Sequence, residues 1–526
     1  MEIEVQYNKL LIEQGKLDPL GIWRVGDRLI GELLPPFTTV VGQRPARYFS
    51  MYCWILDQTI EKFAKDKQPL TFWRYFFELE AIFLCAIQLH KSHNYPDFHG
   101  MIGVEHAWRL INSHKDGQPY KFAKVKINNG WEVNYKNPMF SFDLVKNDYG
   151  IAGKINLTDK GKSLSDVYRK SISSTNYYAK YRGESEIPEK VLEELSGKCC
   201  PCLIHSPDTG MKAERDMAVD VLLAKRPDED GSYLYSSIML VLRCIEQTAV
   251  KGTFVPQSFM RASTTGLIDG KGRIFDPGPF VETYRKWRLY ALDSLFTFSL
   301  ESGLRGFLES LNMNKGRISV QSALSIVQSK ELVNIRKKIC QEVGIGELDI
   351  VKLYRNKSPV LGSYEECLID KIKMNDTGPK MRILYSYLLY SYCQGMYEIF
   401  KGQDEFKEAI SFYEHRAMHD SEEISLAHAY EDVKGRQDDY EIFRELFLGK
   451  WIIQRQLSIR SQRVKEVAWF TRSTDGFYEW EHEYEPGVYR ASRLPNLLYF
   501  LLSINVVVHE SPGWKINPEM KEKLKW

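Results

Sequence analysis

The sequence predicts a mainly α-helical, multi-domain protein with winged-helix-like units near its N- and C-termini. The chain has 526 residues, which is enough for about three to four domains of ordinary size. Helical spacing of apolar residues recurs along most of the chain, whereas strand patterns are few and short. Residues 150–170 read as a short strand followed by a basic amphipathic helix, which is typical of the closing part of a winged helix.

Three helices are expected near the N-terminus. The first lies within residues 17–36 and ends at the Pro35-Pro36 pair, because proline cannot continue a helix. The second and third occupy residues 44–64 and 72–90, and both carry an apolar face. A loop-rich region, with one short helix, is expected after them.

The stretch GIAGKINLTDKGKSLSDVYRK at residues 150–170 is the most informative in the chain. Ile155 and Leu157 suit a strand, and Thr158 suits the N-cap of a helix. Asp159 then falls in the first helical turn, where a negative charge is favourable. Winged helices bind DNA or other proteins, so this stretch predicts a binding module.

The remainder of the chain is expected to be helical up to its tail. Segments with helical patterns lie at residues 188–197, 214–224, 234–248, 280–311, 319–327, 329–343, 364–374, 380–400, 406–428 and 438–470. In the tail, residues 477–489 suggest a hairpin or an irregular arm, residues 490–504 a helix and residues 505–508 a strand. This predicts a second small winged-helix-like unit.

The predicted domains are an N-terminal winged-helix-like domain at residues 1–175, helical domains at 176–312 and 313–435, and a C-terminal helical or winged-helix-like domain at 436–526.

Composition limits the classes of function. The net charge is only +2, so any contact with nucleic acid must come from local basic patches. Nine cysteines, most of them single within apolar runs, indicate free thiols in a reducing compartment. The N-terminus lacks the pattern of a signal peptide, and the longest uncharged apolar run, residues 494–508, is shorter than the roughly 20 residues that span a membrane. We therefore expect a cytoplasmic protein that does not contact membranes.

Basic residues supply the candidate DNA contacts. They accompany the wing-like segment, the start of the second helix and the helical stretch near residue 460, where lysine and arginine would meet phosphates without reading sequence. The candidates are Arg44, Arg47, Lys154, Lys160, Lys162, Arg169, Arg455, Arg460 and Arg463. An ordinary solvated helix face, or an acidic protein partner, would explain the same patches.

Motifs for metal or nucleotide chemistry are incomplete. Gly161-Lys162-Ser163 resembles the end of a phosphate-binding loop, but Asn156 stands where that loop needs glycine. We therefore predict no nucleotide cofactor.

The sequence leaves open whether two groups of side chains bind a metal ion, one rich in cysteine and one formed by histidines. Cys199, Cys200, Cys202 and His205 form C-C-P-C-x-x-H, but structural zinc sites usually draw ligands from two separated places, and no second cysteine pair follows. A buried turn is favoured there.

Other histidines are also weak candidates. His415, His419 and Glu423 share a helix face without the glutamate that a zincin needs, and five histidines lie irregularly at residues 90–114. We predict no metal and no catalytic residues, so the chain is not expected to be an enzyme.

Several islands of sequence resemble one family. They are L-D-P-L-G-I-W-R-V-G-D-R-L-I-G-E-L-L-P-P-F-T-T with R-P-A-R-Y-F-S-M-Y-C-W, Cys200-Pro201-Cys202, residues 285–290 and residues 451–467. Together they resemble the third, accessory subunit of Lamassu-type bacterial anti-phage and anti-plasmid systems. The resemblance implies a partner of an ATPase of the structural-maintenance-of-chromosomes kind and of a nuclease, and it carries no catalytic residues.

The expected function is a non-catalytic adaptor that joins such an ATPase to a nuclease and contacts double-stranded DNA. One alternative is a metal-dependent nuclease or hydrolase that uses the histidines at residues 90–114 or His415 and His419. A second is a winged-helix transcriptional regulator, against which the large aromatic-rich helical body argues.

Overall fold

The computed structural model describes residues 20, 22–37, 45–63, 68–90, 104–114, 117–123, 125, 130–206, 208–223, 233–249, 254–269, 272–374, 376–418, 424–462, 469–480, 493–510 and 513–523. In these ranges the protein is mainly α-helical, as the sequence predicts, with four small antiparallel sheets. Among the helices described, none is both long and apolar enough to cross a lipid bilayer.

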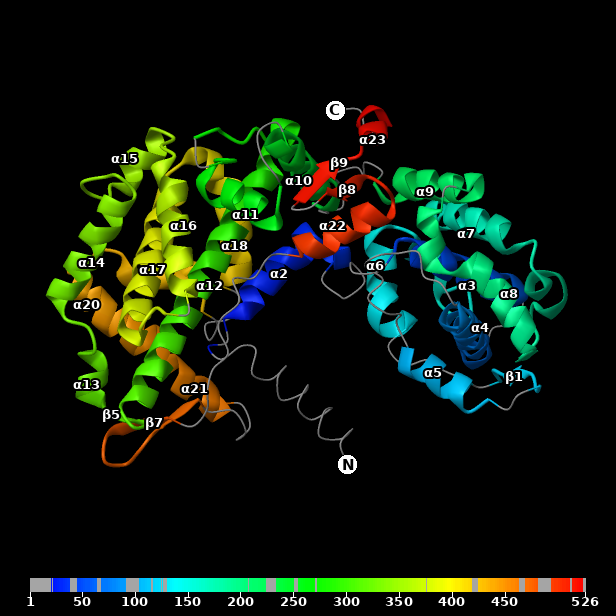
Figure 1. Ribbon diagram of the computed structural model, residues 1–526, viewed down its shortest axis with the longest axis horizontal. Coiled ribbons are helices and arrows are strands. Elements are labelled where there is room, and N and C mark those ends of the chain that lie inside the picture. The colour runs from blue at the N-terminus through cyan, green and yellow to red at the C-terminus, as the bar shows by residue number, and fades with distance from the viewer. Residues whose placement is uncertain are drawn as a thin grey trace. The chain divides into compact units, whose positions relative to one another are not determined.

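The chain forms two compact units, and each unit is assembled from two separate stretches (Figure 1). Unit 1 consists of Met1–Leu33 with Val250–Ser492, and unit 2 consists of Leu34–Ala249 with Arg493–Trp526. The units are therefore interleaved along the chain, which no local sequence signal indicates. The four segments expected from the sequence, with boundaries near residues 175, 312 and 435, stay a prediction.

Unit 2 is built around packed helices. Its helical elements are η1 (Pro35–Phe37), α3 (Arg47–Phe63), α4 (Pro69–Leu89), α5 (Val104–Asn112), η3 (Trp131–Tyr135), α6 (Lys136–Ser141), α7 (Asp159–Ile172), η4 (Tyr177–Tyr181), α8 (Glu189–Cys199), η5 (Pro201–His205), α9 (Thr209–Leu222), α10 (Leu234–Ala249), α22 (Leu494–Ser503) and α23 (Pro518–Lys523). Its strands are β1 (Tyr120–Lys121), β2 (Val145–Asn147), β3 (Ile155–Leu157), β4 (Glu186–Ile187), β8 (Val507–Glu510) and β9 (Gly513–Ile516).

The wing-like segment has the local structure that its sequence predicts. Thr158 caps α7, and its Oγ1 accepts the N–H of Gly161 at 3.2 Å. β3 pairs antiparallel with β2, a strand that the sequence patterns do not indicate, and the two form a hairpin. A Cβ on Gly161 would lie 2.1 Å from the carbonyl oxygen of Leu144, so α7 begins directly against the backbone at the base of this hairpin. The identification of a winged-helix-like unit here stays a prediction.

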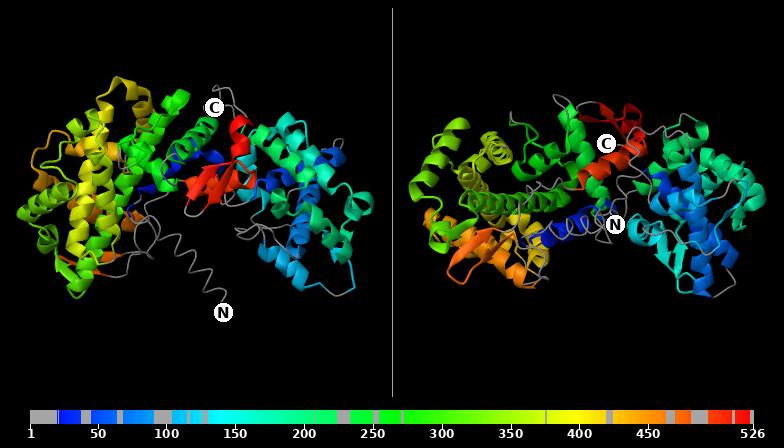
Figure 2. Two further views of the ribbon diagram at one scale, coloured as in Figure 1. Left: turned by 45° about the horizontal axis from the view of Figure 1, so that its top comes forward. Right: turned by 60° about the horizontal axis from the view of Figure 1, so that its bottom comes forward.

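The C-terminal stretch completes the core of unit 2. The ring of Phe500 on α22 lies 5.2 Å from the ring of Phe37 and 5.5 Å from that of Phe142, measured between centroids. β8 and β9 pair with each other, and β9 packs against α10 (Figure 2). The expected helix and strand are thus present, with the strand two residues later than predicted, and a second winged-helix-like unit stays a prediction.

Two expectations for unit 2 are wrong. Gly197 was expected to end its helix, but α8 continues to Cys199, where Arg47 binds the backbone carbonyls at the helix end. The loop-rich region was expected to hold one short helix, but besides α5 it contains α6, which follows η3 without a break and includes Pro138.

Unit 1 is also a helical body, with one three-stranded sheet. Its helical elements are α2 (Trp23–Leu33), α11 (Pro256–Thr265), η7 (Gly278–Phe280), α12 (Val281–Met313), α13 (Val320–Leu324), α14 (Ser329–Glu342), α15 (Ile350–Arg355), α16 (Val360–Lys373), α17 (Pro379–Lys401), η8 (Asp404–Phe406), α18 (Lys407–Ala417), α19 (Leu426–Val433), α20 (Asp439–Glu441), the π-helical η9 (Ile442–Gln454) and α21 (Arg455–Gln462). The sheet has the order β5 (Arg317–Ser319), β7 (Phe477–Trp480), β6 (Phe470–Arg472).

Two long antiparallel helices, α12 and α17, form the centre of unit 1 and lie side by side in Figure 1. Near one end, Gly306 of α12 faces Ile383 of α17, and a Cβ on this glycine would lie 2.9 Å from the carbonyl oxygen of Pro379. Glycine therefore allows the close approach of the two backbones, and α12 runs through this position without a break.

Buried acids lie beside this helix pair. The carboxyl of Glu365 on α16 accepts hydrogen bonds from Thr264 at 3.0 Å and from Tyr392 at 3.3 Å. Burial raises the pKa of Glu365 to about 8, although both hydrogen bonds lower it. Burial likewise raises the pKa of Asp293 on α12 to about 6, against the hydrogen bond from Tyr413. Both groups bind helices to one another.

We expect Glu365→Gln to remove a pH dependence of stability in unit 1. Because the pKa of Glu365 is raised in the folded state, this residue contributes most to the free energy of unfolding below about pH 4.5. That contribution is lost as the pH rises through about 8. The loss amounts to a few kcal/mol, since one pKa unit corresponds to about 1.4 kcal/mol. Thermal unfolding between pH 5 and pH 9 should therefore show a smaller decline in Tm for the variant than for the wild type.

The matched control is Glu366→Gln, which alters the neighbouring residue. Glu366 is 41% exposed, pairs with Arg261 and has only a minor effect on the pKa of Glu365, so its replacement should change the pH dependence much less than Glu365→Gln does. Parallel curves for wild type and Glu365→Gln would contradict the buried, protonated state of Glu365.

Candidate functional site

The expected DNA contacts differ sharply in their surroundings. Arg47 was expected at the surface, but its side chain is 0% exposed, and it forms an ion pair with Glu214, which is also 0% exposed. Because DNA cannot reach this guanidinium, the structure removes Arg47 from the DNA-contact set.

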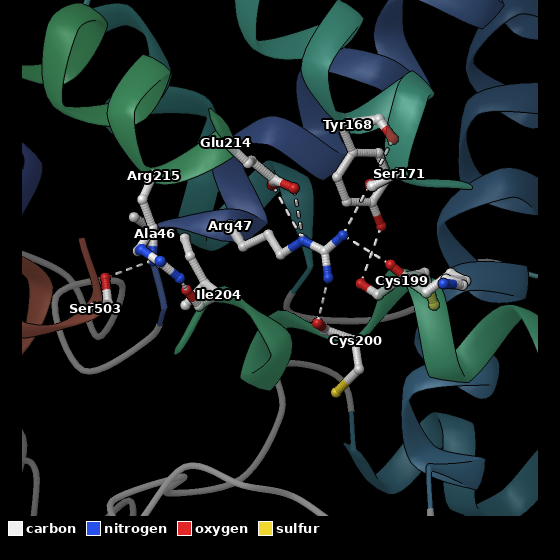
Figure 3. Close-up of polar contacts among 11 residues, drawn as sticks. Ala46, Arg47, Tyr168, Ser171, Cys199, Cys200, Ile204, Glu214, Arg215 and Ser503 are labelled. Atoms are coloured by element: carbon white, nitrogen blue, oxygen red, sulfur yellow. Dashed lines mark hydrogen bonds and ion pairs between the residues drawn. The ribbon is translucent and has the colours of Figure 1, made fainter. Parts of the chain in front are cut away.

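Arg47 instead organises four helices of unit 2 (Figure 3). Its Nε donates to both carboxylate oxygens of Glu214 on α9, each at 3.1 Å. Its terminal nitrogens donate to the carbonyl oxygens of Lys198 and Cys200, both at 2.7 Å, and to Oγ of Ser171 on α7 at 2.9 Å. We call these five residues the Arg47 cluster.

The electrostatics of the Arg47 cluster keep the arginine charged. Burial lowers the pKa of Arg47, but the Glu214 carboxylate, together with Tyr168 and Cys199, more than offsets this, and the pKa is raised overall. The ring of Tyr168 also lies 5.2 Å from Cζ of Arg47, which favours a cation. The two acceptor carbonyls lie at the C-terminal end of α8, where the helix dipole is negative. The cluster is a structural ion pair.

Three further candidates are engaged in internal contacts. Lys160 pairs with Asp143 at 3.0 Å, Arg169 pairs with Asp57, and Arg455 donates to the carbonyl oxygen of Leu20 at 2.9 Å. These contacts weaken the case for DNA binding by Arg169 and Arg455. Arg44, Arg463 and the side chain of Arg460 lie outside the described residues.

The remaining candidates, Lys154 and Lys162, are exposed, as are Lys146 and Lys170 of the same segment. Residues 145–172 comprise the β2–β3 hairpin and α7, and we call them the hairpin–helix segment. This segment carries six basic and three acidic residues, a net charge of +3, whereas the whole chain has +2. The segment is therefore locally basic.

The tip of the hairpin is ordered by its own side chains. Asp148 accepts the N–H of Gly150 at 2.9 Å and the amide of Asn156 at 3.0 Å, and the pKa of Asp148 is lowered by these bonds. Tyr149, at the tip, is 82% exposed. The hairpin thus presents an aromatic ring and Lys154 to solvent.

The cysteine group differs in membership from the group that the sequence suggests. The Sγ of Cys202 lies 3.0 Å from the Sγ of Cys200 and 3.4 Å from Nδ1 of His90. Among the described residues, these three form the one group with metal-ligating atoms all within 4.8 Å of one another. Cys199 and His205 do not belong to it. Burial, with a smaller effect of Arg215, lowers the pKa of His205 to about 4.

His90 could not be selected from spacing alone, since it precedes Cys200 by 110 residues. Of the other histidines, His114 stacks on Tyr120 with 3.7 Å between ring centroids. Within the described residues neither His114 nor His415 joins a metal-ligating group, and His93, His99, His419 and Glu423 lie outside them.

Comparisons with known proteins give no relative: no protein-family model, no curated protein and no solved structure matches the chain.

We expect Arg47→Met to destabilise unit 2 by about 3–5 kcal/mol, because the Glu214 carboxylate would stay buried without its counter-charge. Hydrogen exchange of the α7 and α8 amides would measure the loss within unit 2. The double variant Arg47→Met with Glu214→Leu should recover part of it, because no unpaired charge remains.

Arg169→Met provides the control. Its side chain is 36% exposed in its pair with Asp57, so its loss should cost about 1 kcal/mol or less. Equal effects of the two arginine substitutions would contradict the special role given to Arg47.

Proposed function

We propose that the protein is a non-catalytic scaffold of a bacterial defence complex, which contacts the DNA backbone through the hairpin–helix segment and joins an ATPase of the structural-maintenance-of-chromosomes kind to a nuclease. The exposed lysines of this segment, with its net charge of +3, carry the proposal. The sequence resemblance described above supplies the kind of partner.

The hairpin–helix segment suits contacts with phosphates rather than with bases. Lys154 and Lys162 are exposed, and neither forms an ion pair with any residue that the structure describes. Lysine is a mobile point charge that binds phosphate without demanding a fixed geometry. The exposed ring of Tyr149 could pack against sugar or base edges beside them.

The buried ionisable groups favour a scaffold. Arg47 joins four helices of unit 2, and Glu365 and Asp293 are bonded to side chains of neighbouring helices in unit 1. Each of these groups has a structural role in helix packing. This role accounts for its altered pKa, so no catalytic role is needed to explain it.

Co-purification is the direct test of the scaffold. A tagged chain, expressed with its native neighbouring genes, should recover a long coiled-coil ATPase and a nuclease in fixed proportion. Recovery of the chain alone would contradict the proposal and favour an independent regulator, and nuclease activity of the isolated chain would favour the enzyme instead.

We expect Lys154→Gln combined with Lys162→Gln to weaken DNA binding mainly at low salt. The logarithm of the DNA-binding constant falls as the logarithm of the salt concentration rises. Each lost phosphate contact makes this fall less steep by roughly 1, so the double variant should make it less steep by about 2. Fluorescence anisotropy with a labelled duplex, over a salt series, measures both slopes.

The control changes Lys190 and Lys212 to glutamine, because both are exposed lysines of unit 2 outside the hairpin–helix segment. It should retain the wild-type slope. A slope unchanged by the test variant would show that the hairpin–helix segment does not bind DNA.

A further inference from the structure

Three soft donor atoms converge in unit 2 from two separate parts of the chain. His90 forms the C-cap of α4, and its backbone N–H donates to Ile87. Cys200 lies between α8 and η5, and Cys202 lies in the first turn of η5. Helices α4 and α8 pack against each other, so the packing brings the imidazole to the thiols. This supplies the second, separated segment that the cysteine cluster lacks in the sequence.

The turn is held in place from its other side. Arg47 binds the carbonyl oxygens of Lys198 and Cys200, which fixes the backbone around the first thiol. Figure 3 shows the sulfur of Cys200 pointing away from the Arg47 guanidinium. Pro201 restricts the backbone between the two cysteines. The thiols are therefore directed to one place before any ligand arrives.

The distances between the three donor atoms approach those between the ligand atoms of a bound zinc ion. With bonds of about 2.3 Å to sulfur and 2.0–2.1 Å to nitrogen, tetrahedral zinc holds two sulfurs about 3.8 Å apart and sulfur and nitrogen about 3.5–3.6 Å apart. The observed separation of 3.4 Å between Cys202 Sγ and His90 Nδ1 nearly meets this. The two sulfurs, at 3.0 Å, need to separate slightly, which a side-chain rotation achieves.

We propose that His90, Cys200 and Cys202 form a site for a thiophilic divalent cation of the zinc type, which fastens the end of α4 to the turn after α8. Two thiolates and an imidazole are the donors such an ion prefers. The two thiol protons leave to solvent on binding, so an ion of charge 2+ adds no net charge to this buried place. Solvent takes the fourth position. The proposal is independent of the scaffold function.

Metal analysis of the full-length chain tests the site. The protein, purified under reducing conditions without chelator and incubated with Zn²⁺, should retain about one zinc ion after desalting. His90→Ala and Cys202→Ser should each weaken zinc binding at least about tenfold, since even loss of an outer partner of a ligand costs that much. Cys199→Ser is the matched control, because Cys199 is buried beside the site but outside it, and it should keep the ion.

X-ray absorption at the zinc edge of the wild-type protein gives a readout that does not depend on how the variants fold. It should show two sulfur ligands at about 2.3 Å with nitrogen and oxygen at about 2.0–2.2 Å. Failure to retain zinc, a coordination sphere without sulfur, or loss of zinc in Cys199→Ser with retention in His90→Ala would overturn the proposal. So would a mass lower by two hydrogens under reducing conditions, which would show a stable disulfide between Cys200 and Cys202.

Discussion

Unit 2 depends on one buried charge pair, between Arg47 and Glu214. A guanidinium without water must satisfy its N–H groups within the protein, and here it does so by binding α7, α8 and α9 from its own position on α3. None of these helices can shift without leaving a buried charge poorly solvated. The same contacts fix the turn at Cys200 and the end of α7. The thiol cluster and the exposed lysines thus share one structural support.

Charge in this protein has two separate uses. At the Arg47–Glu214 pair it is withdrawn from water and specifies which helices pack together. On the hairpin–helix segment it remains in water, where the lysines are available to a partner. Composition cannot separate these uses, since both count equally toward a net charge of +2. Burial separates them, and it shows that the hairpin–helix segment is one place where lysines gather on the exposed side.

Local signals in the sequence predicted most of the helices. They could not predict contacts between residues that lie far apart in the chain. The N-cap at Thr158 and the stop at Pro35-Pro36 depend on neighbouring residues alone, and both are confirmed. Arg47 lies at the basic start of a helix, a position that is usually exposed to solvent. Its burial depends on Glu214, which lies far along the chain. His90 reaches Cys202 only through the packing of α4 on α8. Sequence alone could not have paired these residues.

The interleaving of the two units has a consequence for biosynthesis. Phe37 and Phe142 leave the ribosome early, but Phe500, which packs against both, comes only after Val250–Ser492 has been made. At about 5–20 residues per second, this takes on the order of 10–50 s. During that time the rings of Phe37 and Phe142 lack the partner that α22 later provides. Because each unit combines two separate stretches of the chain, neither can be produced by simply truncating the gene.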